Sequence, residues 1–260
     1  GQVLHQWDFD WDQLWAGDTS GYDYENADVE HVHGIKMLAN GDLVFNYTEA
    51  TLFRISPCGD VIWRLAELAH HSIHIDETGA IWAPNQVRHQ TPVDRLPNHK
   101  PPFFEFLLMK VSPEGEILRE ISVQELLMQN GLLGLLYLAT LQNEDTLVTG
   151  DTLHLNDIEV FPSSMEEGVF KHGDVMISLR NINTVLVFDP ETLKMRHIMT
   201  GTFLRQHDPD FVDGNTISLY DNNNLLPAPF DNSSDSSALD QSSRILQISA
   251  DDGDVSVLYQ

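Results

Sequence analysis

Cysteine is nearly absent from the chain, which has Cys58 alone among 260 residues. One cysteine excludes both an internal disulfide and a cysteine-based metal site. Lysine and arginine are also scarce, at 14 against 40 aspartates and glutamates, so the formal net charge is −26. A surface this acidic repels phosphate backbones and anionic lipid, and we expect no nucleic acid among the partners.

Long apolar runs are missing too. The most apolar stretch, residues 132–141, is about half as long as a membrane-spanning helix requires, so we expect no membrane insertion. Neither a P-loop nor a glycine-rich dinucleotide motif occurs, which gives no sign of a nucleotide cofactor. No signal peptide is visible in the sequence, and this leaves the localisation open because an export signal can be removed.

What the chain does contain is a repeated hairpin. A strand of alternating apolar residues, a Ser or Asp, a turn and a second alternating strand recur four times, with turns at residues 57–60, 113–116, 190–191 and 250–254. In the first two copies proline sets φ at the first corner and glycine supplies a positive φ later. Each copy therefore predicts a β-hairpin.

A second hairpin precedes each of these, so each unit has four short antiparallel strands, the blade of a β-propeller. We expect a single all-β domain with four complete blades, at residues 31–68, 70–122, 154–200 and 206–260. Residues 1–7 resemble an outermost strand without its partners. This favours a chain trimmed from a larger propeller over a ring closed irregularly by residues 8–30.

Two insertions interrupt the repeat. Residues 85–102 are rich in proline and histidine and predict a long loop. Residues 122–141 predict a helix, because Ser122 and Glu125 have the spacing of a capping box. Its apolar side is expected to pack against the propeller.

Polar side chains recur at one position of the innermost strands. Aligning the blades places His33, His71, Asn156 and His207 at equivalent sites, and the innermost strands of a propeller line its central channel. His154 precedes Asn156 by two residues, so strand alternation puts both on one face. Arg180 ends the following strand. One such histidine alone is most often structural, whereas the repetition favours a ring of polar groups; His70 and the other histidines are expected in loops or at the surface.

The segments His-Leu-Asn-Asp-Ile at 154–158, Ser-Leu-Arg-Asn at 178–181 and Arg-Gln-His-Asp at 205–208 resemble the PAPS-independent arylsulfate sulfotransferases. The resemblance runs from about residue 30 to the C-terminus. It implies a six-bladed propeller that moves a sulfuryl group from an aryl sulfate to a phenol, with no cofactor and no metal. It also implies a periplasmic or secreted protein.

The resemblance further implies roles for five residues. His207 is the nucleophile that carries the group as a sulfohistidine, and His71 fills the remaining catalytic histidine position. His154, also counted among the catalytic histidines, binds the sulfate oxygens with Asn156 and Arg180. The segment between Ile158 and Val175 is expected beside the sulfate site.

The chemistry is reasonable on its own terms. Sulfuryl transfer resembles phosphoryl transfer, in which charge spreads over the equatorial oxygens and fixed donors stabilise it. An imidazole is a competent nucleophile near neutral pH, and a second imidazole can move the phenolic proton.

Two other functions stay open on the sequence. One is a non-catalytic binding propeller whose polar ring is structural or grips a protein or glycan. The other is a calcium-dependent propeller hydrolase, although the ring is richer in histidine than in the oxygen ligands that calcium prefers. A homo-oligomer also remains open.

Overall fold

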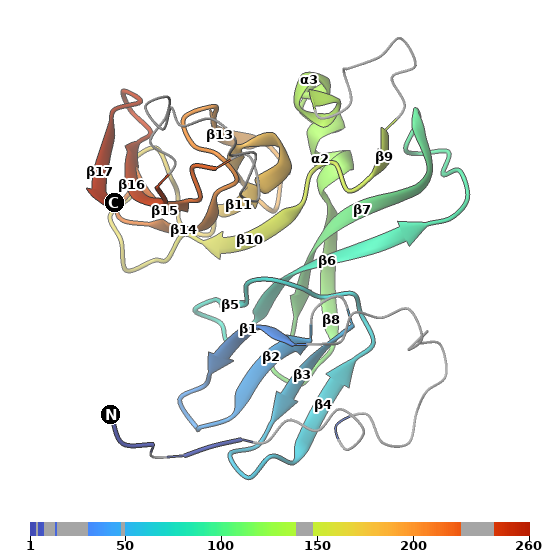
Figure 1. Ribbon diagram of the computed structural model, residues 1–260, viewed down its shortest axis with the longest axis vertical. Coiled ribbons are helices and arrows are strands. Elements are labelled where there is room, and N and C mark those ends of the chain that lie inside the picture. The colour runs from blue at the N-terminus through green and yellow to red at the C-terminus, as the bar shows by residue number, and fades with distance from the viewer. Residues whose placement is uncertain (4, 8–13, 15–30, 48–49, 139–147, 225–241) are drawn as a thin grey trace, which may run out of the picture.

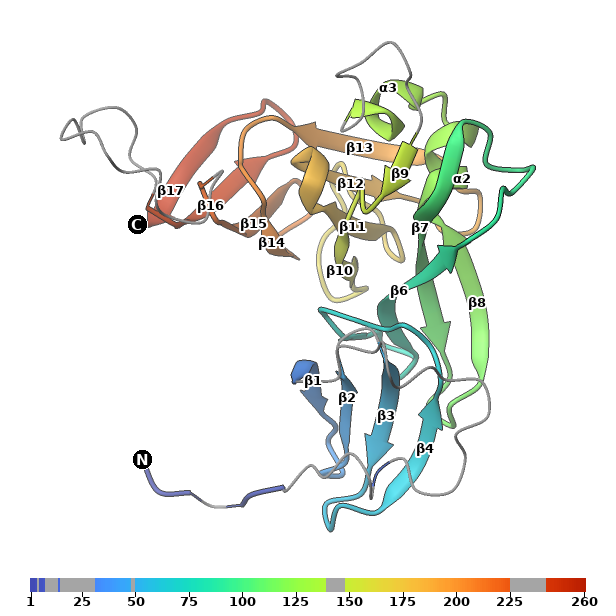
Figure 2. The same cartoon turned by 45° about the vertical axis from the view of Figure 1, so that its right-hand side comes forward.

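The computed structural model describes residues 1–3, 5–7, 14, 31–47, 50–138, 148–224 and 242–260. Its strands form four sheets, each with four antiparallel strands in chain order, and the second sheet has a fifth strand (Figure 1). Figure 2 shows the sheets following one another along an arc, from the blue first sheet to the red fourth. This is a propeller arrangement of four blades, and it confirms the predicted fold class. The first blade consists of β1 (Val32–Met37), β2 (Leu43–Tyr47), β3 (Thr51–Ile55) and β4 (Val61–Leu65), and the second of β5 (His74–Ile75), β6 (Ile81–His89), β7 (His99–Val111) and β8 (Ile117–Ser122). The third blade consists of β10 (Leu155–Val160), β11 (Val175–Leu179), β12 (Thr184–Phe188) and β13 (Met195–Thr200). The fourth consists of β14 (His207–Phe211), β15 (Thr216–Asp221), β16 (Arg244–Ser249) and β17 (Val255–Tyr259).

The predicted hairpin turns are present. Gly59 and Gly115 adopt φ of +90° and +89° in the turns before β4 and β8. The serine that precedes each turn also has a structural role, because Ser56 Oγ and Ser112 Oγ each accept two backbone N–H groups of the turn that follows. These turns are thus held by both backbone geometry and a side-chain acceptor.

The core lies between adjacent blades. Strand β11 alternates its side chains between two apolar clusters, as the period of a strand requires. Ile177 packs in the cluster shared with the second blade, which includes Trp82, and Met176 packs in the cluster shared with the fourth, which includes Phe211. The third blade is therefore buried on both faces, and this fixes its position relative to its neighbours.

The helical insertion is shorter and more broken than expected. Helix α2 (Val123–Gln129) begins at Ser122, whose Oγ accepts the N–H of Glu125, as the capping-box spacing predicts. The helix ends at Asn130, Gly131 adopts φ of +70°, and a separate short helix α3 (Leu133–Leu136) follows. One continuous helix over 122–141 is therefore wrong, and residues 139–141 lie outside the described residues.

The predicted loop over residues 85–102 is also wrong in part. Strands β6 and β7 pair as far as His89 and Phe103, so the hairpin projects well beyond the other strands of its blade. Strand β9 (Val148–Gly150) pairs with β7 in parallel. The buried Glu105 forms ion pairs with Arg95 and His89 and so holds the projecting hairpin in place. The proline and histidine content of residues 85–102, which predicted a loop, gives no indication of these ion pairs.

Residues 1–3 and 5–7 form no strand in the structure. The outermost strand expected over 1–7 was one without its partner strands, and no described segment pairs with these residues, so that expectation stays a prediction. In the described part of the chain, no helix has the length and apolar character needed to cross a membrane.

Candidate functional site

The candidate residues lie where the innermost strands begin, and the pairing there is irregular. The register shifts between Val32 and Ile35 in β1, between Leu155 and Asp157 in β10, and between His207 and Asp210 in β14. Such bulges bend a strand and redirect its side chains. Three blades thus interrupt their first strand at the position that carries the candidate residues.

Five histidines gather at this end of the blades, and we call them the histidine cluster: His33, His70, His71, His154 and His207. His71 is at the centre. Its ring centroid lies 4.0 Å from that of His33, 4.9 Å from that of His154 and 6.1 Å from that of His207. The three predicted catalytic histidines therefore come together, each from a different blade.

Hydrogen bonds connect part of the cluster. His71 Nε2 lies 3.4 Å from His154 Nε2, and His71 Nδ1 lies 2.8 Å from His70 Nδ1. His70 lies in the loop between β4 and β5, as expected, but it is buried, with 3% of its surface exposed, and is not a surface residue. The adjacent pair His70-His71 is the signal in the sequence that could have found it.

The backbone of the cluster is unusual. His71 and His154 adopt left-handed φ values of 55° and 56°, which non-glycine residues rarely take and which are frequent at functional sites. The His154 conformation is held by the N–H of Arg180, which donates to the carbonyl of His154 at 3.0 Å. Arg180 itself begins the 3₁₀ helix η3 (Arg180–Ile182) directly after β11.

His154 also contacts a carboxylate that the sequence reading did not single out. The Asp151 carboxylate contacts His154 Nδ1, and Asn181 Nδ2 donates to the carbonyl of Asp151 at 3.0 Å. The i, i+3 spacing of Asp151 and His154 is the signal available in the sequence. This spacing predicts a contact between the two side chains only when the conformation of the turn before β10 is known.

Asn156 is buried and reaches the next blade. Its Nδ2 donates at 2.8 Å to the carbonyl of Gln206, the residue before His207. Its Oδ1 has no hydrogen-bond partner among the described residues. In this structure Asn156 therefore braces the segment that carries His207, while its expected contact with sulfate stays a prediction.

Loss of hydration lowers the pKa of four histidines of the cluster: His33, His70, His71 and His207. Loss of hydration lowers the pKa of His207, and the nearby charges of Arg180 and His154 lower it further. Burial likewise lowers the pKa of His71, lowers that of His33 to about 4 and lowers that of His70 to about 3. The Nδ1 of His207 is buried and has no partner among the described residues. Hydrogen bonds with the Arg205 backbone and the Asn222 side chain oppose the shift of the His207 pKa without reversing it, so the neutral imidazole of His207 is favoured near neutral pH.

The insertion between Ile158 and Val175 does not lie beside this site. Strand pairing joins Leu155 to Leu179 at one end of the hairpin and Val160 to Val175 at the other. His154 and Arg180 flank the first end, whereas the insertion connects the second. Strand β10 runs away from the site, so the insertion that follows it lies at the far end of the hairpin. The expectation that the insertion borders the sulfate site is therefore wrong.

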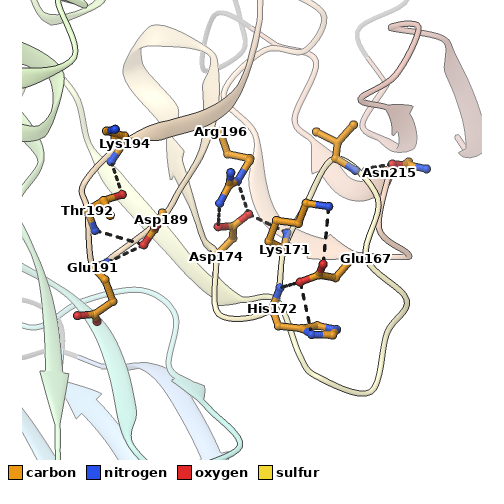
Figure 3. Close-up of polar contacts among 11 residues, drawn as sticks. Glu167, Lys171, His172, Asp174, Asp189, Glu191, Thr192, Lys194, Arg196 and Asn215 are labelled. Carbon is orange, nitrogen blue, oxygen red and sulfur yellow. Dashed lines mark hydrogen bonds and ion pairs between the residues drawn. The ribbon is translucent and has the colours of Figure 1, made fainter.

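A cavity of about 800 Å³ opens at that opposite end, between the second and third blades. Figure 3 shows the contacts of the insertion beside it, including the ion pairs of Lys171 and Arg196. The cationic side chains that line the cavity already face carboxylates: Lys110 with Asp76, Arg119 with Glu191, Lys171 with Glu167 and Arg196 with Asp174. The histidine cluster is therefore the stronger candidate for binding an anionic group.

Within the described ranges, no set of three or more His, Cys, Asp or Glu side chains is arranged to hold a metal ion.

Comparison with known proteins gives one family and distant structural likenesses. No curated protein sequence matches significantly. Among solved structures, virginiamycin B lyase from Staphylococcus aureus is 14% identical, with a TM-score of 0.45 over 90% of this chain and 57% of the lyase. A streptogramin B lyase is 11% identical, with a TM-score of 0.41 over 88% of this chain and 68% of that one. The chain thus spans little more than half of the first lyase, and we draw no conclusion from likenesses at this level.

The family match is of another kind, because it covers most of the chain and includes every residue of the histidine cluster except His33. The model of the family described as arylsulfotransferase (ASST) matches residues 34–260. The chain belongs to the arylsulfotransferase family.

Proposed function

We propose that this protein moves a sulfuryl group from an aryl sulfate to a phenol through a covalent intermediate on His207, without a nucleotide donor. The observation that carries the proposal is the meeting of His71, His154 and His207 from three successive blades. The positive charge of Arg180 acts on the His207 imidazole and lowers its pKa. Membership of the arylsulfotransferase family supports the reaction class.

His207 is the proposed nucleophile. Its lowered pKa leaves a nitrogen lone pair available near neutral pH. That lone pair forms an N–S bond while the bond from sulfur to the aryl oxygen breaks, and the electron pair of the broken bond stays on the phenoxide. In the second half-reaction the acceptor oxygen forms the new S–O bond, and the N–S electron pair returns to His207.

Arg180 is the proposed partner of the sulfuryl oxygens. Charge accumulates on these oxygens in the transition state, and a fixed cation beside them stabilises that charge. The influence of Arg180 on the pKa of His207 indicates that its charge already acts at the nucleophile. Asn156 supports the site by holding the carbonyl before His207, and its unpartnered Oδ1 marks the side chain as the second candidate for contact with the substrate.

His71 and His154 are the proposed groups for moving the phenolic proton. His71 lies beside His207, and its Nε2 faces the Nε2 of His154. A poor leaving group such as a phenoxide needs a proton as its bond to sulfur breaks, and a positioned imidazole supplies one. By family resemblance we place the reaction in the periplasm or outside the cell.

The test uses 4-nitrophenyl sulfate as donor and a phenol as acceptor, with release of nitrophenol and formation of the new sulfate ester as readouts. His207→Asn should lower both rates by about 1,000-fold or more, as loss of a nucleophile does in other enzymes that form covalent intermediates. His5→Asn, at an exposed residue that contacts Pro57 in the first blade, is the matched control and should keep wild-type rates. Mass spectrometry of protein quenched in alkali should find one sulfuryl group on a peptide that contains His207.

Equal rates for wild type and His207→Asn would show that another group is the nucleophile. Activity that disappears with EDTA and returns with calcium would replace the proposal with a calcium-dependent hydrolase. Absence of turnover under all of these conditions would favour a binding propeller.

A further inference from the structure

Four side chains form a continuous chain of contacts in the site: Asp151, His154, His71 and His70. The Asp151 carboxylate contacts His154 Nδ1, His154 Nε2 faces His71 Nε2 at 3.4 Å, and His71 Nδ1 faces His70 Nδ1 at 2.8 Å. Each of the two central histidines therefore uses both of its ring nitrogens. The 3.4 Å contact is the longest in the chain, and it is the one that a substrate oxygen would open, to about 4.5–5 Å, in order to bond to both nitrogens.

The carboxylate decides where the hydrogens lie. An ionised carboxylate only accepts hydrogen bonds, so His154 Nδ1 carries a hydrogen. In the uncharged chain His154 Nε2 is then an acceptor, and His71 Nε2 must be the donor that faces it. His71 Nδ1 in turn accepts from His70 Nδ1. The order of donors and acceptors along all three imidazoles thus follows from one residue, Asp151.

The fold holds Asp151 in place. Asn181 Nδ2 donates to the Asp151 carbonyl, and the backbone N–H groups of Arg180 and Asn181 donate to the carbonyls of His154 and Leu153. The turn from Asp151 to His154 is therefore fixed at both ends by the residues that follow β11. The Asp151 side chain is 35% exposed, whereas that of His154 is 17% exposed, so the carboxylate lies at the solvent side of the chain.

We propose that Asp151 is the positioning residue that makes His154 a proton-exchange group, and that the phenolic oxygen binds between His71 Nε2 and His154 Nε2. This inference rests on the proposed sulfuryl transfer. A phenol bound there accepts the hydrogen bond of His71 Nε2 through a lone pair and donates its own hydrogen to His154 Nε2. The site therefore recognises a hydroxyl that can donate and accept at once.

The proton balance closes over the two half-reactions. When the acceptor oxygen attacks the sulfur on His207, its proton passes to His154 Nε2, and the resulting imidazolium is neutralised by the Asp151 carboxylate. When the next aryl sulfate reacts, the departing phenoxide takes this proton back from His154. One proton taken up from solvent by His154 Nε2 brings the uncharged resting chain into this cycle, and after that no proton is gained or lost over a full turnover.

The surroundings show why a carboxylate is needed. Other basic groups lie close to these histidines. They are His33 on β1, His207 on β14, Arg180 on η3 and Arg88 on β6, the last of them beside His70. A positive charge on His154 would be unfavourable among them without a compensating anion. Asp151 supplies that anion in direct contact with the ring that receives the proton.

The experiment compares two donors in Asp151→Asn. Phenyl sulfate releases a phenol with a pKa near that of tyrosine, about 10, and its phenoxide needs a proton to depart. The nitrophenoxide of 4-nitrophenyl sulfate is stabilised by its nitro group and needs none. We expect Asp151→Asn to slow the first half-reaction about 10- to 100-fold with phenyl sulfate and less than about 3-fold with 4-nitrophenyl sulfate. Asp254→Asn, in the exposed turn before β17, is the matched control and should leave both rates unchanged.

Equal slowing with both donors would overturn the proposal, because a merely structural defect does not depend on the leaving group. A second measurement does not require activity. Nitrogen-15 NMR of the imidazoles in the uncharged wild-type protein should show His154 protonated at Nδ1 and His71 protonated at Nε2, and the opposite tautomers would overturn the proposal even if Asp151→Asn fails to fold. If no aryl sulfate is turned over by wild type, the proposed function fails, whereas the tautomers still decide whether Asp151 orders the chain.

Discussion

Asn46 on β2 holds the backbone of His71 in the neighbouring blade. Its Nδ2 donates to the His71 carbonyl at 3.1 Å, and its Oδ1 accepts the N–H of Gly34 at 3.1 Å. The side chain is fully buried. The first blade therefore positions a histidine of the second, and Asn156 does the same for the fourth blade through Gln206.

Replacing Asn46 should weaken both the fold and the site. Asn46→Ala leaves the buried Gly34 N–H and His71 carbonyl without this partner, so we expect the free energy of unfolding in urea to fall by about 1–3 kcal/mol. Turnover of 4-nitrophenyl sulfate should fall with it, since His71 loses its fixed position. Asn40→Ala, in the turn where Asn40 bonds to Asp42, should change the unfolding free energy by less than about 1 kcal/mol. Equal losses in the two variants would show that the contact between blades is unimportant.

Glycine is required at position 34 because the His71 backbone approaches it closely, and not because of its φ angle. A Cβ at this position would lie 1.9 Å from the His71 carbonyl oxygen, and the two backbones would have to separate. We expect Gly34→Ala to lower the unfolding free energy by about 1–3 kcal/mol or more and to lower turnover. Gly134→Ala in α3 meets no atom within 4 Å and should be neutral or slightly stabilising. A Gly34→Ala protein with wild-type unfolding and activity would contradict the tight contact.

The repeat explains why the sequence predicted as much as it did. Equivalent positions of successive blades occupy equivalent places around one axis, so the alignment of the blades is enough to predict that His71 and His207 lie close together. The hairpins were predictable for a local reason, because each turn carries its own serine, proline or glycine signal. Blade order then follows from chain order.

The remaining features depend on geometry that a repeat does not encode. His154 contacts Asp151 from a left-handed backbone conformation, and the N–H of Arg180, at the start of η3, holds that conformation through the His154 carbonyl. The burial of His70 depends on packing against neighbouring rings. The place of the insertion after Val160 could have been predicted, since alternate ends of a hairpin lie a full strand apart.

The acid limb of the pH–rate profile should depend on the positive charge of Arg180. Burial, Arg180 and His154 lower the pKa of His207, so the nucleophile stays neutral below the usual histidine value of about 6.5. Removing the positive charge with Arg180→Gln raises this pKa, because the imidazolium is then less disfavoured. The pH profile of the nitrophenol burst should therefore show its acid limb at higher pH than in wild type. Arg119→Gln, whose arginine pairs with Glu191 at the far end of the blades, should leave the limb in place, and a limb unmoved in Arg180→Gln would separate Arg180 from the nucleophile.

A buried carboxyl on β10 should destabilise the protein at neutral and alkaline pH. Asp157 is 2% exposed, and its Oδ2 has no partner among the described residues. Burial raises its pKa well above the usual range, the nearby acids Glu159, Asp208 and Asp210 raise it further, and a hydrogen bond with Ser72 opposes them. The folded protein thus keeps a proton that the unfolded chain has lost above about pH 4, so the free energy of unfolding falls as the pH rises through this range.

Asp157→Asn removes that penalty while keeping the shape of the side chain. We expect the variant to be more stable than wild type by about 1 kcal/mol or more near pH 8, and the gain to disappear near pH 4, in urea unfolding at a series of pH values. Asp252→Asn should act in the opposite direction. The exposed carboxylate of Asp252 accepts the N–H of Asp254, and contacts with Ser249 and that backbone lower its pKa, so its charged form stabilises the fold. A loss of stability in Asp157→Asn near pH 8 would mean that the folded protein holds Asp157 as a favourable anion, against the cost that burial places on an unpaired charge.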